Sequence, residues 1–185
     1  MAISFNDAQP QASGEFQPIP DGTIAPVRLT VRGEKMTKAG DARMLDCEFI
    51  VTSGTYAKRK IWTNMMITSN GTDGHDKAVQ ITMSRVRAML ESAYGIAEDD
   101  KSPDAMQGRT INDWPDLDGL EFLAKIGIEK SKDPKYPDDK NTVQAVGTKH
   151  AEYAHFKPAK PKAMKSVGAV AGAVTASNGS RPSWA

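Results

Sequence analysis

The sequence has few or no residues of several kinds, and each shortage excludes a class of protein. Cys47 is the only cysteine among 185 residues, so a disulfide framework or a thiolate zinc site within one chain is excluded. No run approaches the roughly 20 consecutive apolar residues of a membrane helix, and the N-terminus does not have the pattern of a signal peptide. No Gly-rich loop followed by Lys-Ser or Lys-Thr is present to hold a phosphate. We therefore expect a cytoplasmic protein that uses no cofactor and does not enter a membrane.

Charge is nearly balanced in total but is segregated along the chain. The formal net charge is +1. Residues 28–60 hold eight basic and four acidic side chains, residues 98–121 hold two basic and eight acidic ones, and residues from 157 onward hold five basic and no acidic ones. Because salt screens charges over about 10 Å, local charge can dominate, and a near-neutral protein can still offer one basic face. Random clustering on a solvated surface is the alternative.

The hydrophobic pattern predicts five strands and one long helix. Apolar and polar residues alternate with period two in residues 23–32, 44–53, 58–68, 120–130 and 141–148. Between the third and fourth of these strands, apolar residues at spacings of three and four predict a helix from about residue 76 to 94, capped by Gly95. Its stripe consists of Val79, Met83, Val86, Leu90 and Ala93. Pro26 lacks an N–H group, so its part of the first strand is expected at a sheet edge or bulge.

The element order predicts the fold class and the domain boundaries. Three strands, a helix and two strands are typical of a five-stranded, partly open Greek-key barrel of the OB type, mainly β with one helix (α+β), although other small α+β sheets share this order. We assign this domain to residues 22–150. Residues 1–21 are expected to form a flexible arm, with Phe16 and Ile19 as candidate anchors. Residues 151–185 are expected to form a basic, disordered tail rich in Pro, Ala and Gly.

Cations and aromatic residues are interleaved around the second and third strands. Proteins that bind single-stranded nucleic acid without sequence preference need this mixture, because cations neutralise phosphates and flat rings stack on bases. The candidates for phosphate contact are Lys35, Lys38, Arg43, Lys58, Arg59 and Lys60. The candidates for stacking are Tyr56 and Trp62, with Tyr153 or Phe156 as candidates to close the groove.

A purely structural interpretation of each of these residues is also open. A tryptophan in a small β domain is often buried, although inward-facing Ile61 and Met65 would direct Trp62 outward. Tyr56 can be an ordinary connector residue. The run from Lys58 to Lys60 can be a solvated strand edge that deters pairing with other chains.

Two short motifs carry a resemblance to a known family. Residues 37–40 read TKAG, and residues 54–62 read GTYAKRKIW. Over about residues 20–148 the chain resembles a family of phage and prophage proteins, long catalogued as a domain of unknown function, that are similar to phage single-stranded-DNA-binding proteins. Asp41 and Lys58 depart from the pattern, because the family usually has Asn and Gly there.

The resemblance implies an OB-like fold and a role in coating single-stranded DNA during phage replication or recombination. It directs functional interest to Lys38, Tyr56, Arg59, Lys60 and Trp62. For a phage-encoded protein we expect the host cytoplasm as the location. Replication or recombination proteins are candidate partners for the C-terminal tail. That tail is basic, however, whereas bacterial single-strand binders end in an acidic tail, and its lysines are alternative candidates for phosphate contact. The sequence leaves a homo-oligomer open.

Two other functions compete with DNA binding. Pro115-Asp116 and Asp138-Asp139-Lys140 nominally match the carboxylate and lysine pattern of a metal-dependent nuclease, but the second group falls in a Pro-Asp turn rather than a strand. No other residues suggest a metal site, since His75, His150 and His155 are scattered. The second alternative is a protein–protein adaptor or recombination accessory factor that does not contact DNA. We therefore expect a non-enzymatic protein.

Overall fold

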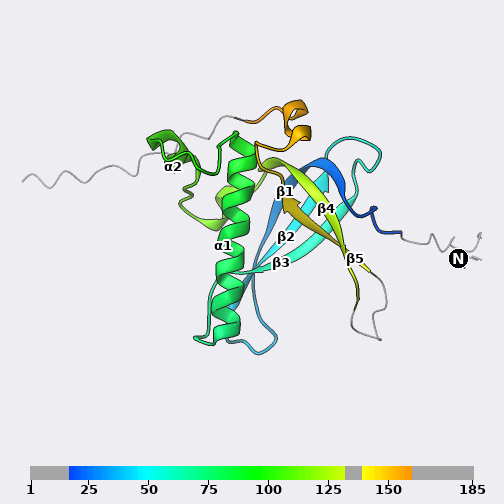
Figure 1. The fold of residues 1–185 in the computed structure, drawn as a ribbon. Coiled ribbons are helices and arrows are strands. Elements are labelled where there is room, and N and C mark those ends of the chain that lie inside the picture. The colour runs from blue at the N-terminus through cyan, green and yellow to red at the C-terminus, as the bar shows by residue number, and fades with distance from the viewer. Residues whose placement is uncertain (1–16, 132–138, 160–185) are drawn as a thin grey trace, which may run out of the picture.

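The protein contains a five-stranded antiparallel sheet with its first strand at the centre. The structure is a computed structural model and describes residues 17–131 and 139–159. The strands are β1 (Thr23–Met36), β2 (Arg43–Val51), β3 (Lys60–Met66), β4 (Glu121–Glu129) and β5 (Lys140–Ala145), and their order is β3-β2-β1-β4-β5. The two outer strands, β3 and β5, come close to each other (Figure 1). The predicted element order is confirmed, and the protein is mainly β with one main helix.

Helix α1 (Asp73–Tyr94) lies alongside the sheet and covers part of the core (Figure 1). Asp73 and Asp76 in its first turn complement the helix dipole, and Gly95 ends it with φ 70°. Val86, Leu90 and Ala93 of the predicted stripe are buried, but Met83 is 49% exposed, because only the second half of the helix packs on the sheet. Within the described ranges, no helix is both long and apolar enough to cross a membrane.

Shorter helical segments follow α1 and β5. Helix α2 (Pro103–Gly108) and the 3-10 helix η1 (Trp114–Leu117) lie in the acidic region between α1 and β4. A second 3-10 helix, η2 (Ala151–His155), follows β5.

The core lies on the face of the sheet toward which the alternating apolar residues point. Leu45, Cys47 and Phe49 of β2 are almost fully buried, as the period-two pattern predicts. Phe49 meets Phe122 of β4 edge to face, with ring centroids 5.9 Å apart. Burial raises the pKa of the Cys47 thiol to about 12, so this cysteine is an inert core residue.

Strand β1 departs from the prediction at both ends. Pro26 lies in the central strand rather than at an edge, and it is tolerated because β2 has ended there: Thr52 donates its N–H to the Pro26 carbonyl at 2.9 Å. The strand also continues to Met36, four residues beyond the predicted end at residue 32. A bulge interrupts its pairing with β2, since Val31 faces Cys47 but Gly33, with φ 132°, faces Asp46.

The packed region is wider than the predicted range 22–150. Ile19 is 1% exposed and belongs to the core, as its role as a candidate anchor requires. Tyr153, assigned to the tail, is 8% exposed and packs with Leu123 and Val146 in a second apolar cluster. Phe16, the other candidate anchor, lies outside the described residues, and so does the predicted tail from residue 160 onward.

We expect Tyr153→Ala to lower the free energy of unfolding by about 3 kcal/mol, because it removes a buried ring from the second cluster. The variant also loses the hydrogen bond from the Tyr153 hydroxyl to the Ser92 carbonyl. Urea unfolding measures the effect. The control is His155→Ala, which changes an exposed neighbouring residue. Equal stability of the two variants would show that residues 151–156 do not contribute to the core.

Candidate nucleic-acid interface

The face of the sheet opposite the core carries a polar row on β3. Lys60, Trp62 and Asn64 alternate with the inward-facing Ile61 and Met65, so they point away from the core. Trp62 is 55% exposed. The interpretation of Trp62 as a core residue is therefore wrong.

Glu48 of β2 organises this outer face. It lies directly across the strand pair from Trp62, and its side chain is only 7% exposed. Its Oε1 accepts from Lys60 Nζ at 2.9 Å, and its Oε2 accepts from Trp62 Nε1 at 3.0 Å. Arg32 Nη1 on β1 reaches the same Oε2 at 3.3 Å. One carboxylate thus holds an indole and two cations that come from three strands.

The hydrogen bond from Lys60 lowers the pKa of the Glu48 carboxyl most, and the bond from Trp62 adds to this effect. Burial acts in the opposite direction, but the net shift is downward from the ordinary value of 4.5. Glu48 is therefore a carboxylate at neutral pH. The Arg32 and Lys60 side chains remain 54% and 48% exposed, so both cations can be reached from solvent.

A second ion pair extends this face toward the end of β1. Lys35 Nζ lies 3.3 Å from Asp46 Oδ2. The bulge at Gly33 makes this pair possible, because the extra residue shifts the alternation and puts Lys35 on the outer face with Asp46. Lys35 is consequently a strand residue, although it lies outside the predicted first strand, residues 23–32.

A groove of about 640 Å³ runs between β3 and the start of β5. Trp62 and Lys60 line it together with Lys35, and Asp139 and Lys140 approach from the other side. The remaining lining residues are Asp46, Ile61, Thr63, Asn64 and Asn141. The groove thus combines three lysines with one exposed aromatic ring.

Seven of the ten predicted site residues lie outside this groove, and four of them pack or pair elsewhere in the fold. Arg43 shares the opposite face of β2 with Leu45 and pairs with Glu34 at 2.9 Å. Tyr56 is partly buried and packs against the core. Tyr153 and Phe156 pack together in the second cluster, with ring centroids 5.6 Å apart, so they do not close the groove.

The other predicted cations lie in the loops at the two ends of the β2–β3 hairpin. Lys38 is exposed in the loop before β2, and Lys58 is exposed in the loop before β3. Within residues 17–131 and 139–159, neither forms an ion pair. Arg59 connects the loop before β3 to the segment before β1, since its Nη2 donates to the Gln17 carbonyl at 2.6 Å.

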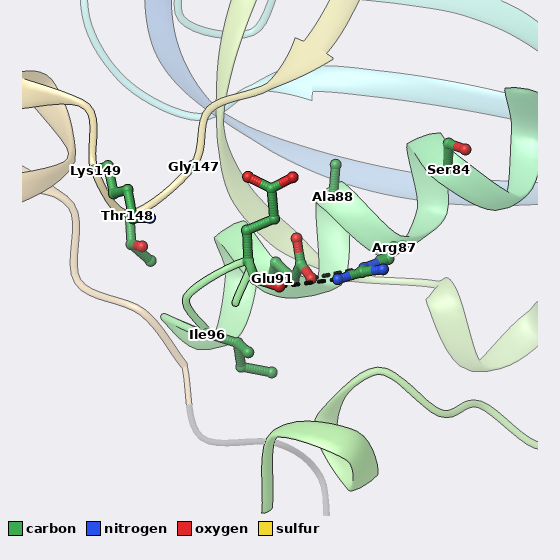
Figure 2. A pocket seen from close by; sticks show the side chains of 9 residues that line it. Ser84, Arg87, Ala88, Glu91, Ile96, Gly147, Thr148 and Lys149 are labelled. Carbon is green, nitrogen blue, oxygen red and sulfur yellow. Dashed lines mark hydrogen bonds and ion pairs between the residues drawn. The ribbon is translucent and has the colours of Figure 1, made fainter. Parts of the chain in front are cut away.

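A second depression, of about 400 Å³, lies between α1 and the segment after β5 (Figure 2). Arg87 and Glu91 form an ion pair at 2.8 Å on its helix side, and Thr148 and Lys149 lie across from them. Unlike the groove beside β3, it offers no exposed aromatic ring, so it does not combine stacking with cations.

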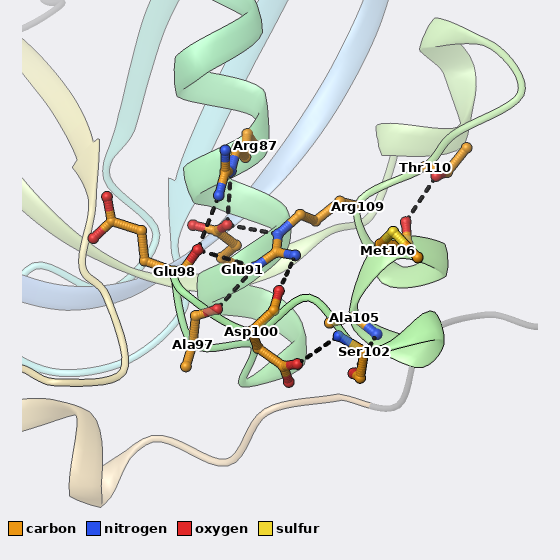
Figure 3. Close-up of polar contacts among 10 residues, drawn as sticks. All are labelled: Arg87, Glu91, Ala97, Glu98, Asp100, Ser102, Ala105, Met106, Arg109 and Thr110. Atoms are coloured by element: carbon orange, nitrogen blue, oxygen red, sulfur yellow. Dashed lines mark hydrogen bonds and ion pairs between the residues drawn. The ribbon is translucent and has the colours of Figure 1, made fainter.

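The acidic region, residues 98–121, lies away from the groove and is held by Arg109 (Figure 3). Arg109 Nε donates to the buried Glu91 at 2.6 Å, and its other nitrogens donate to the carbonyls of Ala97 and Asp100 at 2.8 and 2.6 Å. Asp113 and Asp116 cap η1. Much of the acidic charge therefore serves local structure and does not cover the groove as a mimic of DNA.

The nuclease-like pattern is not brought together among the described residues. Asp116 lies in the η1 cap, whereas Asp139 pairs with Lys130 at 2.8 Å beside β5. The two carboxylates line different depressions. Asp138 lies outside the described residues. In the described part of the chain, no group of three His, Cys, Asp or Glu side chains could hold a metal ion.

Sequence reasoning missed three residues of this face: Arg32, Glu48 and Lys140. Alternation alone places Glu48 on the polar side of β2, because Cys47 and Phe49 point inward. Its partners depend on the register between β2 and β3, which the sequence does not specify. Arg32 reaches Glu48 from β1, and Lys140 meets β3 through the approach of the two outer strands.

No protein-family model matches this chain, and no curated protein matches it. The geometry of the groove and its polar network is therefore the basis for assigning a function.

We expect Lys58→Gly to raise the free energy of unfolding by about 1 kcal/mol. The reason is that Lys58 has φ 69°, a left-handed conformation that is unfavourable for an L-residue with a side chain but not for glycine. Lys38→Gly is the matched control, since it replaces another exposed loop lysine without relieving a positive φ. Thermal or urea unfolding measures both, and an equal change in both variants would argue against strain at Lys58.

The stabilising effect of Glu48 should depend on pH. Because the pKa of this carboxyl is lowered in the folded protein, its contribution is complete above the ordinary value of 4.5 and is lost as the pH falls through the folded value. We expect Glu48→Gln to be less stable than the wild type by about 1 kcal/mol at neutral pH, since all three partners are half exposed. The difference should shrink as the pH falls below 4.5, which urea unfolding at several pH values can check. A difference independent of pH would contradict this role.

Proposed function

We propose that this protein binds single-stranded DNA in a sequence-tolerant manner, by phosphate neutralisation and base stacking on the outer face of β2 and β3. The observation that carries the proposal is the exposed indole of Trp62, held between cations on the wall of an open groove. In this proposal the fold is an OB-type barrel. The strand order, the proximity of β3 to β5 and the helix between β3 and β4 support that assignment.

The chemistry follows from the positions of the groups. Trp62 presents its ring to an unpaired base while its Nε1 stays bonded to Glu48. Lys35, Lys60 and Lys140 line the groove on both sides of the ring and contact phosphates of adjacent nucleotides. Lys38 and Lys58, at the two ends of the β2–β3 hairpin, extend the phosphate contacts beyond the groove.

The biological setting in this proposal is the coating of single strands exposed during phage replication or recombination. That setting rests on the resemblance of residues 37–40 and 54–62 to the phage family. An adaptor without DNA contacts is the competing function, and the next experiment separates the two.

We expect Trp62→Ala to weaken binding to a single-stranded oligonucleotide by about 1–3 kcal/mol, because it removes one base-stacking platform. The fold should persist, since Trp62 is 55% exposed. Trp62→Phe is the matched control, because it keeps an aromatic face and should retain most of the affinity. Fluorescence polarisation of a labelled oligonucleotide at two salt concentrations measures both, and the wild-type affinity should fall as the salt concentration rises.

Tryptophan fluorescence gives an independent readout of the same contact. The chain contains three tryptophans, and Trp114 packs against the core. The quenching that DNA causes in the wild type but not in Trp62→Phe therefore reports position 62. An adaptor would show neither quenching nor salt-dependent affinity, and either absence would overturn the proposal.

A further inference from the structure

We infer that the free edge of β3 forms hydrogen bonds with unpaired bases through its main chain, at Trp62 and Asn64. The inference rests on the proposed function and deepens it, because it names the chemical group that the groove recognises. That group is the Watson–Crick edge of a base. Stacking on the indole alone would accept any flat ring, whereas these hydrogen bonds require a base whose edge is exposed.

The hydrogen bonds at the two ends of the β2–β3 pair show which backbone groups of β3 face away from β2. The Val51 N–H donates to the Arg59 carbonyl at 2.9 Å, and the Ile67 N–H donates to the Arg43 carbonyl at 2.9 Å. Hydrogen-bonded residues alternate along an antiparallel pair, so the odd-numbered residues of β3 are the ones that bond to β2. The N–H and C=O groups of the even-numbered residues therefore point away from β2.

These outward backbone groups lie on the wall of the groove. Strand β3 is an outer strand of the sheet, and β2 is its only neighbour among the described residues. The groove is lined by the consecutive residues 60–64, whereas one face of a strand would contribute only every second residue. It therefore follows the edge of β3, where Trp62 and Asn64 present their N–H and C=O groups. Within residues 17–131 and 139–159, no hydrogen bond occupies those groups.

Asn64 adds a side-chain donor and acceptor beside the ring. It is exposed and lies two residues from Trp62, so it shares the outer face of β3 with the indole. Glu48 accepts from Trp62 Nε1, but the amide group of Asn64 has no hydrogen-bond partner in the part of the chain that the structure describes. The edge thus combines a ring for stacking with backbone and amide groups for hydrogen bonding.

An unpaired base fits this edge better than a peptide strand does. Neighbouring strands lie about 4.7–4.9 Å apart, so a strand inserted between β3 and β5 needs about twice that separation. Cα atoms of β3 and β5 already approach within 8 Å of each other, which is too close for a strand between them. The lysines of the groove, Lys35, Lys60 and Lys140, also attract the phosphates of a nucleic acid.

Main-chain groups allow the contact to require an unpaired base and still tolerate any sequence. The Watson–Crick edge of each base carries a donor beside an acceptor, and each strand residue presents its N–H beside its C=O. Thymine, for example, offers its N3–H to a carbonyl and its O4 to an N–H. In a duplex the partner base occupies this edge, so duplex DNA cannot make the contact.

Oligothymidine and an oligomer of N3-methylthymidine test the ligand side. The methyl group removes the N3–H donor but keeps a flat ring for stacking on Trp62. By fluorescence polarisation, the wild-type affinity should be about two- to tenfold lower for the methylated oligomer, the effect of losing one hydrogen bond. Quenching of Trp62 at saturating concentration should persist with both oligomers, because stacking does not need the donor.

Asn64→Pro tests the protein side, because proline has no N–H group. The Asn64 N–H points away from β2, so the substitution should leave the β2–β3 pairing intact. Asn64→Ala removes the same side chain but keeps the N–H, so we expect Asn64→Pro to bind oligothymidine about two- to tenfold more weakly than Asn64→Ala. The matched control is Met66→Pro, which removes another outward N–H of β3 beyond the residues that line the groove and should bind like the wild type.

The outcomes separate the inference from the proposed function. If the wild type binds neither oligomer, both are wrong. If the wild type binds the two oligomers equally, with quenching of Trp62, the inference is overturned and the proposed function stands. Equal affinity of Asn64→Pro and Asn64→Ala for oligothymidine has the same meaning. If Asn64→Pro does not fold, the comparison of the two oligomers with the wild type decides alone.

Discussion

Strand β1 is the constraint on which the rest of the architecture depends. It pairs with β2 along one edge and with β4 along the other, so it joins the β2–β3 pair to the β4–β5 pair. The bulge at Gly33 reverses the alternation of inward and outward side chains in the last residues of β1. Without that extra residue, Lys35 would point toward the core side rather than toward Asp46. The composition of the outer face is therefore determined by the backbone of a strand that contributes few side chains to the groove.

The pairing of Glu48 with Trp62 converts this backbone arrangement into a chemical surface. A carboxylate with so little exposure is stable only with compensating donors, and three strands supply them: Arg32, Lys60 and the indole of Trp62. The network fixes the orientation of the ring and limits the free positive charge at the same time. One carboxylate thus determines both the orientation of the exposed ring and the local charge around it.

The sequence was sufficient to predict the features that depend on alternation and was insufficient for those that depend on register. The strands, the inward positions of Leu45 and Phe49 and the outward position of Trp62 follow from period two. Alternation also places Arg43 on the opposite face of the sheet from Trp62. Counting basic residues along the chain does not take the two faces into account, so it grouped Arg43 with the cations near Trp62. Tyr153 could not be placed, because its burial depends on contacts with Leu123 and Ser92 far away in sequence.

Charge is balanced locally at two places in the described part of the chain. The acidic region does not cover the groove, because its aspartates cap η1 and its backbone carbonyls are bound by Arg109. On the outer face of the sheet, charge is neutralised between Glu48 or Asp46 and the lysines beside them. Within the described residues, two local charge balances therefore lie apart, one between Arg109 and Glu91 near α1 and one between Glu48 and its cations beside β3. Because screening confines each balance to its own neighbourhood, a change at Glu48 alters the groove without disturbing the acidic region.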